Sequence, residues 1–216
     1  INNSNFVFAV GLNEEDNKFQ LLYVNSVPIQ GITDNRISDY DLICKIFKKN
    51  IYDIEQKFQI VFKNVIIIID NFDCSINNYS GFKKLNGTQL VKDNITYILN
   101  VLKSKINEFE NEKTILHIFN TKFLLDKKQI DNLPIGLFGN FYSHELSFLL
   151  INSNNLKNLE NIIKECNLKI KKIVSKNFIE GVELIDKNPS LESFFKIQIN
   201  KNFSQVLFFE KSAIKF

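Results

Sequence analysis

A continuous β-branched run, Val65-Ile66-Ile67-Ile68-Ile69, is the feature that most restricts how this chain folds. Such a run without polar alternation is typical of a strand that is covered on both faces in a largely buried sheet. Apolar residues recur every three or four positions both before and after the run, which predicts a long helix on each side of it. Strand and helix patterns that follow one another in this way predict an α/β fold.

The remaining elements are predicted from the same patterns. Strands are expected at residues 6–11 and 19–26, and the polar residues 13–17 between them are typical of a hairpin turn. Ser38 is the expected cap of the first helix. The other predicted elements are a short polar strand after residue 71, a helix over 90–109, strands at 114–125 and 145–151, a helix over 156–167 that ends at Asn167, and strands at 170–174, 194–199 and 205–209.

Composition bounds the class of protein. The chain has 216 residues, of which 44% are hydrophobic, so one large domain or two small ones can bury ordinary cores. Its apolar runs are far shorter than the roughly 20 residues of a membrane-spanning helix. Residues 1–5 lack the layout of a secretory signal, and we expect a cytoplasmic protein. Residues 213–216 end the chain in apolar sequence, and we expect that the full protein is longer.

The cysteine and basic residues argue against further classes of function. Cys44, Cys74 and Cys166 are odd in number and far apart, so neither a disulfide framework nor a zinc site is expected, and we predict unreactive thiols. The net charge is +3, the lysines occur in scattered pairs, and Arg36 is the only arginine. A nucleic-acid surface needs basic residues gathered on one face, so no nucleic-acid partner is expected.

Several other polar residues are candidates for catalytic roles, but the sequence does not favour those roles. His117 and His144 have no Cys, Ser or carboxylate at a diagnostic spacing, and structural or surface roles are expected. Asp70 and Asp73 flank the end of the predicted buried strand, a common position for a catalytic acid in α/β folds, but a structural role is expected here as well. The consecutive acids 14–16 are expected to be a solvated loop and not a metal site.

Three segments resemble the family of the bacterial cell-division protein FtsA, in the order that the family has them. Residues 115–119 (ILHIF) resemble a strand like VLHVIP, residues 134–139 (PIGLFG) a segment like NPxGLxG, and residues 165–170 (ECNLKI) a helix end like CGLKV. Leu133 is an extra residue before the second segment, and Asn167 stands where the family usually has glycine. Residues 27–32 and 63–68 also resemble family segments, so the resemblance spans nearly the whole chain.

The resemblance implies a fold and a division into subdomains. The fold would be an α/β core of the actin-like, ribonuclease-H-like type with an inserted α+β subdomain. Residues 1–70 would form the first part of subdomain 1A, 71–168 the inserted subdomain 1C, 169–190 the return to 1A, and 191–216 the start of subdomain 2A. The chain would then end within the second half of the actin-like fold.

The resemblance also implies a function. Members of this family are division scaffolds that link the FtsZ ring to the cytoplasmic membrane, self-associate and recruit later division proteins, here through the inserted subdomain. Contact with FtsZ and membrane attachment by a C-terminal helix would use parts outside this chain, and the expected location is the inner face of the membrane at the division site. An alternative is an actin-like ATPase or kinase with diverged loops. A third possibility, an adaptor resembling small nucleic-acid-associated α+β modules, is disfavoured by the single arginine.

The same family fold implies a site for ATP and Mg²⁺ between two phosphate loops. Residues 1–5 stand where the family has a loop like IGTSK, and they leave Ser4 as the one candidate phosphate-binding residue. Gln198 stands where the second loop, like DIGGGT, has its aspartate, and Asn200 and Lys201 replace residues whose smallness lets backbone N–H groups approach phosphate, although Lys201 offers a compensating charge. A neutral amide lacks the charge that helps to hold hydrated Mg²⁺. Weak or absent nucleotide binding is therefore predicted, with no catalytic residue.

Overall fold

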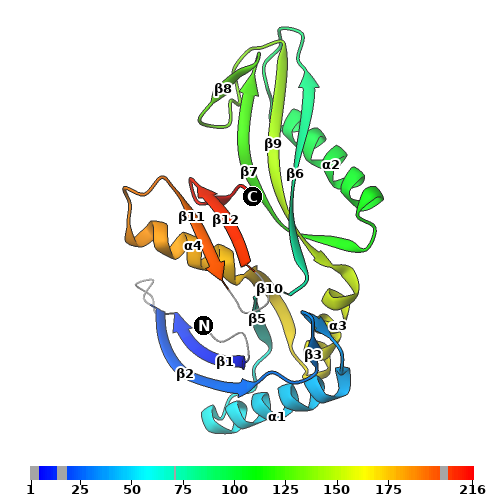
Figure 1. The fold of residues 1–216 in the computed structure, drawn as a ribbon, viewed down its shortest axis with the longest axis vertical. Helices are drawn as coiled ribbons and strands as arrows, with labels where there is room; N and C mark the ends of the chain where they lie inside the picture. The colour runs from blue at the N-terminus through cyan, green and yellow to red at the C-terminus, as the bar shows by residue number, and fades with distance from the viewer. Residues whose placement is uncertain (1–4, 14–18, 71, 200–203) are drawn as a thin grey trace. The chain divides into compact units, whose positions relative to one another are not determined.

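The chain forms two compact units in the computed structural model, which describes residues 5–13, 19–70, 72–199 and 204–216 (Figure 1). The first unit comprises residues 1–73 and 154–173, and the second comprises residues 74–153 and 174–216. Each unit has its own hydrophobic core, so the two are considered separately.

Short strands form the sheets of the first unit. β1 (Asn5–Asn13) and β2 (Phe19–Pro28) pair antiparallel, as predicted, with a register shift between Val10 and Gly11. β3 (Ile32–Thr33) and β4 (Arg36–Ile37) form a small hairpin that was not predicted. Its two turn residues, Asp34 and Asn35, have φ values of 50° and 61°, a conformation that Asp and Asn tolerate well. β5 (Asn64–Ile69) and β10 (Lys169–Ser175) are hydrogen-bonded neighbours in a separate sheet.

Helix α1 (Tyr40–Phe58) begins one residue later than its predicted cap implies. The cap is Asp39, whose Oδ1 accepts a hydrogen bond from the Leu42 backbone nitrogen at 2.9 Å. The predicted cap, Ser38, instead has its hydroxyl 3.1 Å from the hydroxyl of Thr33. A carboxylate at this position also interacts favourably with the positive end of the helix, which a serine hydroxyl does not.

The core of the first unit lies between α1 and α3 (Ser153–Glu165). Ile43 and Cys44 of α1 and Ile162 of α3 are buried together, and aromatic and aliphatic residues of the neighbouring strands pack around them. α3 is followed by Asn167 at a φ of 59°, which confirms the predicted left-handed helix terminus.

The β-branched run in β5 is covered on one face only. Ile69 is buried, but Ile66 and Ile68 are each 57% exposed, so the prediction of a strand covered on both faces is wrong for the described chain. Burial along β5 alternates because successive side chains of a strand point to opposite faces of its sheet. The composition of the run did not reveal that one of these faces is uncovered.

The second unit is built on a four-stranded antiparallel sheet. Its strand order is β6 (Cys74–Lys84), β9 (Phe141–Asn152), β7 (Lys113–Leu125) and β8 (Lys128–Ile130). β6 and β9 pair without interruption along the whole of β6, whereas the pairing of β7 with β9 shifts register at two points.

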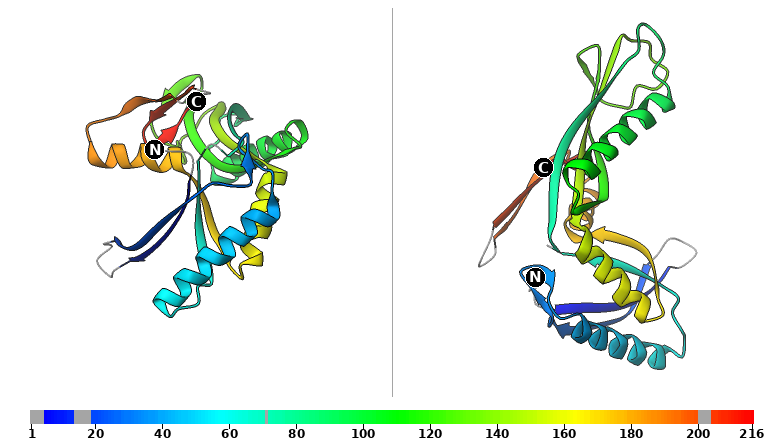
Figure 2. Two further views of the ribbon diagram at one scale, coloured as in Figure 1. Left: turned by 60° about the horizontal axis from the view of Figure 1, so that its bottom comes forward. Right: turned by 90° about the vertical axis from the view of Figure 1, so that its right-hand side faces the viewer.

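Helix α2 (Lys92–Phe109) lies along one face of this sheet (Figure 2). Its buried residues Ile98, Leu102 and Ile106 pack against the β9 side chains that point to the same face, which include Tyr142 and Phe148. Gly81 of β6 permits this close approach, because a Cβ atom there would lie 2.5 Å from Ile98 Cγ2. None of the described helices has both the length and the apolar character that crossing a membrane requires.

A second core forms with the last elements of the chain. These are α4 (Lys176–Lys187) and a sheet with the order β11 (Ser193–Ile199), β12 (Ser204–Glu210) and β13 (Ala213–Ile214). β11 and β12 were predicted, whereas α4 and β13 were not. Phe119 of β7 and Leu149 of β9 are buried with Leu207, Phe209 and Ile214 of this sheet.

Substitution of Gly181 in α4 by alanine is expected to destabilise the protein. Alanine normally favours a helix by about 1 kcal/mol over glycine. Here, however, the new Cβ would lie 2.0 Å from the ring of Phe209, which is fully buried and stacked on Phe194 at 4.8 Å. We expect a net loss of about 1–3 kcal/mol in the free energy of unfolding, measured by urea denaturation. Ser104→Ala, at an exposed position of α2, is the control and should not lower stability.

The stability of the fold is also expected to depend on the protonation of His144. This side chain is 2% exposed, its Nε2 lies 3.0 Å from Asn120 Oδ1, and burial lowers its pKa from 6.5 to about 4. Since the unfolded chain takes up the proton more readily, the neutral imidazole stabilises the fold fully above about pH 6.5, and this contribution is lost as pH falls towards 4.

His144→Gln removes this titration and keeps a donor for Asn120. Between pH 4 and pH 7, the stability of the unmodified protein should rise relative to that of the variant by roughly 1–3 kcal/mol. Urea denaturation of both proteins across this range measures the difference. Parallel stability curves would show that His144 does not titrate with a lowered pKa.

Candidate functional site

Only the strand ends that flank the predicted phosphate loops can be placed. Ser4 of the first loop, and Asn200 and Lys201 of the second, lie outside the described residues. Gln198 lies near the end of β11, directly opposite Gln205 in the β11–β12 register. Two neutral amides therefore face each other beside the second loop.

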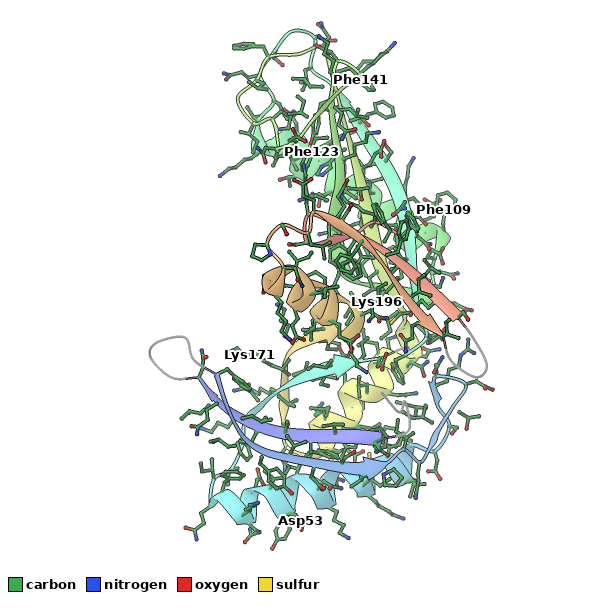
Figure 3. The ribbon with its side chains drawn as sticks, turned by 60° about the vertical axis from the view of Figure 1, so that its left-hand side comes forward. Asp53, Phe109, Phe123, Phe141, Lys171 and Lys196 are labelled. Atoms are coloured by element: carbon green, nitrogen blue, oxygen red, sulfur yellow. The ribbon has the colours of Figure 1, made fainter. Side chains whose placement is uncertain are left out.

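A polar network on α4, β11 and β12 lies next to these glutamines. Lys196 donates to Asn177 Oδ1 at 2.6 Å and to the Glu180 carboxylate, and Figure 3 labels Lys196 where β11 passes beside α4. Asn177 donates in turn to Gln205 Oε1 at 3.2 Å. Lys176 forms a further ion pair with Glu180 at 3.8 Å. The network ties the N-terminal part of α4 to both strands that flank the loop.

The charged side chains of this network form ion pairs with one another. The Lys196 ammonium is held by Glu180, and Glu180 is itself shared between two lysines, so no free carboxylate remains for a hydrated cation. Among the residues that the structure describes, no cluster of three or more side chains suited to holding a metal ion occurs. These contacts join α4 to the strands that precede and follow residues 200–203.

The other residues considered from the sequence have partners that fit structural roles. His117 Nε2 accepts a hydrogen bond from the Ser175 backbone nitrogen at 3.3 Å. Asp73 accepts one from Arg36 Nε at 3.1 Å. The three cysteines are free thiols. Burial raises the pKa of Cys44, and it raises the pKa of Cys166 to about 11, so both thiols are protonated and weakly nucleophilic near neutral pH.

An open hollow on the second unit is unrelated to the predicted phosphate loops. It has a volume of about 400 Å³ and is lined by Lys103 and Asn107 of α2 and by residues 114–118 of β7. No acid and no second cation line it, so it does not add a catalytic constellation.

A group of exposed apolar residues lies at the loop end of the four-stranded sheet. We call this group the tip patch. Five large side chains within two short loop segments are between 38% and 69% exposed. They are Val91, Leu133, Ile135, Leu137 and Phe138.

The two segments that carry the tip patch are hydrogen-bonded to each other. Between residues 85–90 and 136–140, Leu90 donates to the Leu137 carbonyl at 2.9 Å and accepts from Gly136 at 2.8 Å, and further backbone bonds join the rest of the two segments. Gly136 has a φ of 88°, which a side chain at that position would strain. The exposed residues thus stand on an ordered backbone.

From the sequence, this loop was recognised only as a motif and not as an interaction site. Residues 134–139 were quoted for their resemblance to a family segment, and no partner-contact residue was predicted. The signal that was available is the presence of four large apolar residues within six positions of a loop that also contains Pro134 and Gly136. Apolar residues at such density in a turn are seldom all buried, and a large exposed patch often marks an interaction site.

Comparison with solved structures defines the class of fold. The chain is similar to a protein of the PilM-PilN type IV pilus biogenesis complex, with a TM-score of 0.65 and 7% sequence identity, over 98% of this chain and 56% of that one. The fold is therefore mixed α/β and actin-like, as the sequence predicted.

Among curated proteins, the chain is similar to the cell division protein FtsA. It is 25% identical to FtsA of Helicobacter pylori strain 26695 over 114 residues, which are 53% of this chain and 23% of the relative. It is 22% identical to FtsA of Buchnera aphidicola over 162 residues, 75% of this chain and 38% of the relative. The alignments thus span less than two fifths of the curated relatives, and no family model matches the chain.

These similarities support a relationship to FtsA within the actin-like class. The predicted division into subdomains at residues 70, 168 and 190 stays a prediction. The compact units group residues 174–216 with residues 74–153.

Proposed function

We propose that this chain is part of an FtsA-like scaffold of bacterial cell division, which acts by protein–protein assembly. The main support for this proposal is the similarity to FtsA among curated proteins, which reaches 75% of the chain. The fold is also of the actin-like class to which such a scaffold belongs. In this proposal, the full-length protein links FtsZ to the inner face of the cytoplasmic membrane at the division site. It also self-associates and recruits later division proteins.

The tip patch supports a role in assembly. Large apolar side chains on an ordered loop lose little conformational freedom when a partner covers them, and aromatic residues such as Phe138 commonly dominate binding energy at protein interfaces. In the proposed scaffold, residues 74–153 provide the surface that receives later division proteins, whereas FtsZ contact and membrane attachment belong to other parts of the full-length protein.

Localisation of the full-length protein, fused to a fluorescent protein in its own organism, tests this function. We expect a band at mid-cell that disperses when FtsZ is depleted, because a scaffold on the FtsZ ring depends on that ring. Foci at the cell poles, or a band that persists without FtsZ, would contradict the proposal. Polar foci would instead favour an assembly role nearer to that of the pilus complex.

We further propose that nucleotide binding is weak or lost. The amides of Gln198 and Gln205 and the mutual neutralisation of Lys196 and Glu180 support this, because neither supplies a carboxylate for hydrated Mg²⁺. The alternative function, an actin-like ATPase or kinase with diverged loops, requires that Mg-ATP binds nonetheless.

Isothermal titration of Mg-ATP into the full-length protein distinguishes these functions. We expect no saturable heat for the unmodified protein, since its loops lack the family's carboxylate and glycines. The double variant Gln198→Asp, Asn200→Gly restores one of each and is the comparison. Saturable binding by the unmodified protein would overturn the proposal of a lost site, and competent hydrolysis would favour the ATPase.

A further inference from the structure

Exposed lysines lie at the same end of the four-stranded sheet as the tip patch. Lys84 is paired with Phe141 at the end of β6, and Lys92 directly follows Val91 of the patch. Lys127 lies in the turn between β7 and β8, and Lys128 is the first residue of β8, at the same end of the sheet. We call these four residues, Lys84, Lys92, Lys127 and Lys128, the lysine collar. Figure 3 labels Phe141 at this end of the sheet.

Neighbouring acids offset the charge of the lysine collar only in part. No ion pair involves any of the four among the residues that the structure describes. Asp126 is occupied in holding the turn, since its Oδ1 accepts from the backbone nitrogens of Asn140 and Phe141 at 2.8 Å. Asp131 is paired with Lys211 at 3.0 Å. Asp93, in the first turn of α2, and Asp126, next to Lys127, are the exposed acids that offset part of the collar's charge.

A surface with an apolar centre and a positively charged rim is complementary to a partner that is apolar and acidic. The centre fits large apolar side chains, and the rim attracts carboxylates, which would speed association and exclude basic partners. We propose that the tip patch and the lysine collar together bind an acidic peptide segment of a partner protein, which inserts large apolar side chains between the lysines. The proposal rests on the proposed function and deepens it, because it states the chemistry of the partner that residues 74–153 receive.

A two-fold dimer of this chain through the tip patch fits the surface poorly. A two-fold dimer places the same patch of both subunits in one interface, so the collar of one copy would meet the collar of the other. Like charges at close range in an interface oppose association. An acidic segment of a different protein avoids this repulsion.

A membrane surface also fits less well than a peptide, although anionic headgroups would attract the lysines. Gln89 lies opposite Phe138 in a β-bridge, and Asn86 is exposed in the adjoining turn. These polar groups are interleaved with the apolar residues of the patch, and hydrocarbon offers them no hydrogen-bond partners. The backbone and the carboxylates of an acidic peptide do.

Fluorescence anisotropy of a labelled synthetic peptide tests the proposal. The probe is a helical peptide with Leu and Phe at positions i, i+3, i+4 and i+7 and Glu elsewhere, titrated with the 216-residue chain. We expect saturable binding that weakens as salt is raised. Phe138→Ser, and separately Lys127→Glu with Lys128→Glu, should each weaken binding by about tenfold or more.

Matched variants elsewhere control for general loss of an apolar or basic residue. Phe109→Ser removes a side chain that is 73% exposed at the other end of α2, and Lys171→Glu with Lys172→Glu reverses an exposed lysine pair in β10. Both should bind the peptide like the unmodified chain. Circular dichroism of every variant confirms that each is folded.

Several results would overturn the proposal. These are no saturable binding, equal binding of a peptide with Lys in place of Glu, or equal loss in the control variants. Binding to phosphatidylglycerol vesicles that Phe138→Ser abolishes and the peptide does not compete would assign the surface to a membrane. A dimer that is seen by sedimentation velocity and lost in Phe138→Ser would assign it to a second copy.

The result of the peptide-binding experiment can be distinguished from the result of the localisation experiment that tests the proposed function. If the peptide binds as expected but the full-length protein does not localise with FtsZ, the docking site stands and the division role fails. If the protein localises with FtsZ but no peptide binds, the scaffold stands and this partner chemistry fails.

Discussion

Burial of β9 on both of its faces is the constraint on which the second unit depends. Tyr142, Leu146 and Phe148 point to α2, whereas Leu149 of the same strand points to the core shared with β12 and β13. Uninterrupted pairing with β6 on one side and pairing with β7 on the other satisfy its backbone groups. A single strand therefore joins two hydrophobic cores, and the loops at its ends are held in place by it.

The tip patch follows from this anchoring. The loop before β9 is hydrogen-bonded to the segment before α2, so its apolar residues are held outward and do not collapse onto the sheet. Exposed apolar area has a cost in water, since a buried position would be more favourable for the same side chains. The ordered loop that keeps Leu137 and Phe138 in solvent is the observation on which the proposed docking of a partner rests.

At the predicted nucleotide site, by contrast, several nearby polar side chains already have partners. The flanking strands β11 and β12 are in place, yet the side chains near the loop are amides or members of a closed ion-pair network. If nucleotide binding is lost, as we propose, the network still connects α4 to the sheet through Lys196 and Asn177. The proposed scaffold function thus rests on the tip patch, and the proposed loss of nucleotide binding rests on this network.

The sequence by itself determined the α/β class, most strands and three of the four helices, because periods of two and 3.6 residues are local properties of a chain. It also placed the left-handed terminus at Asn167 and, through quoted motifs, the resemblance to FtsA. Only the tertiary structure decided that Ile66 and Ile68 are exposed, that α4 packs through Gly181 on Phe209, and that Lys196 is neutralised by Glu180. It also gathered the tip patch from two loops that lie apart in the sequence. These features depend on contacts between distant residues, and neither burial nor pairing across a sheet leaves a periodic signal in the sequence.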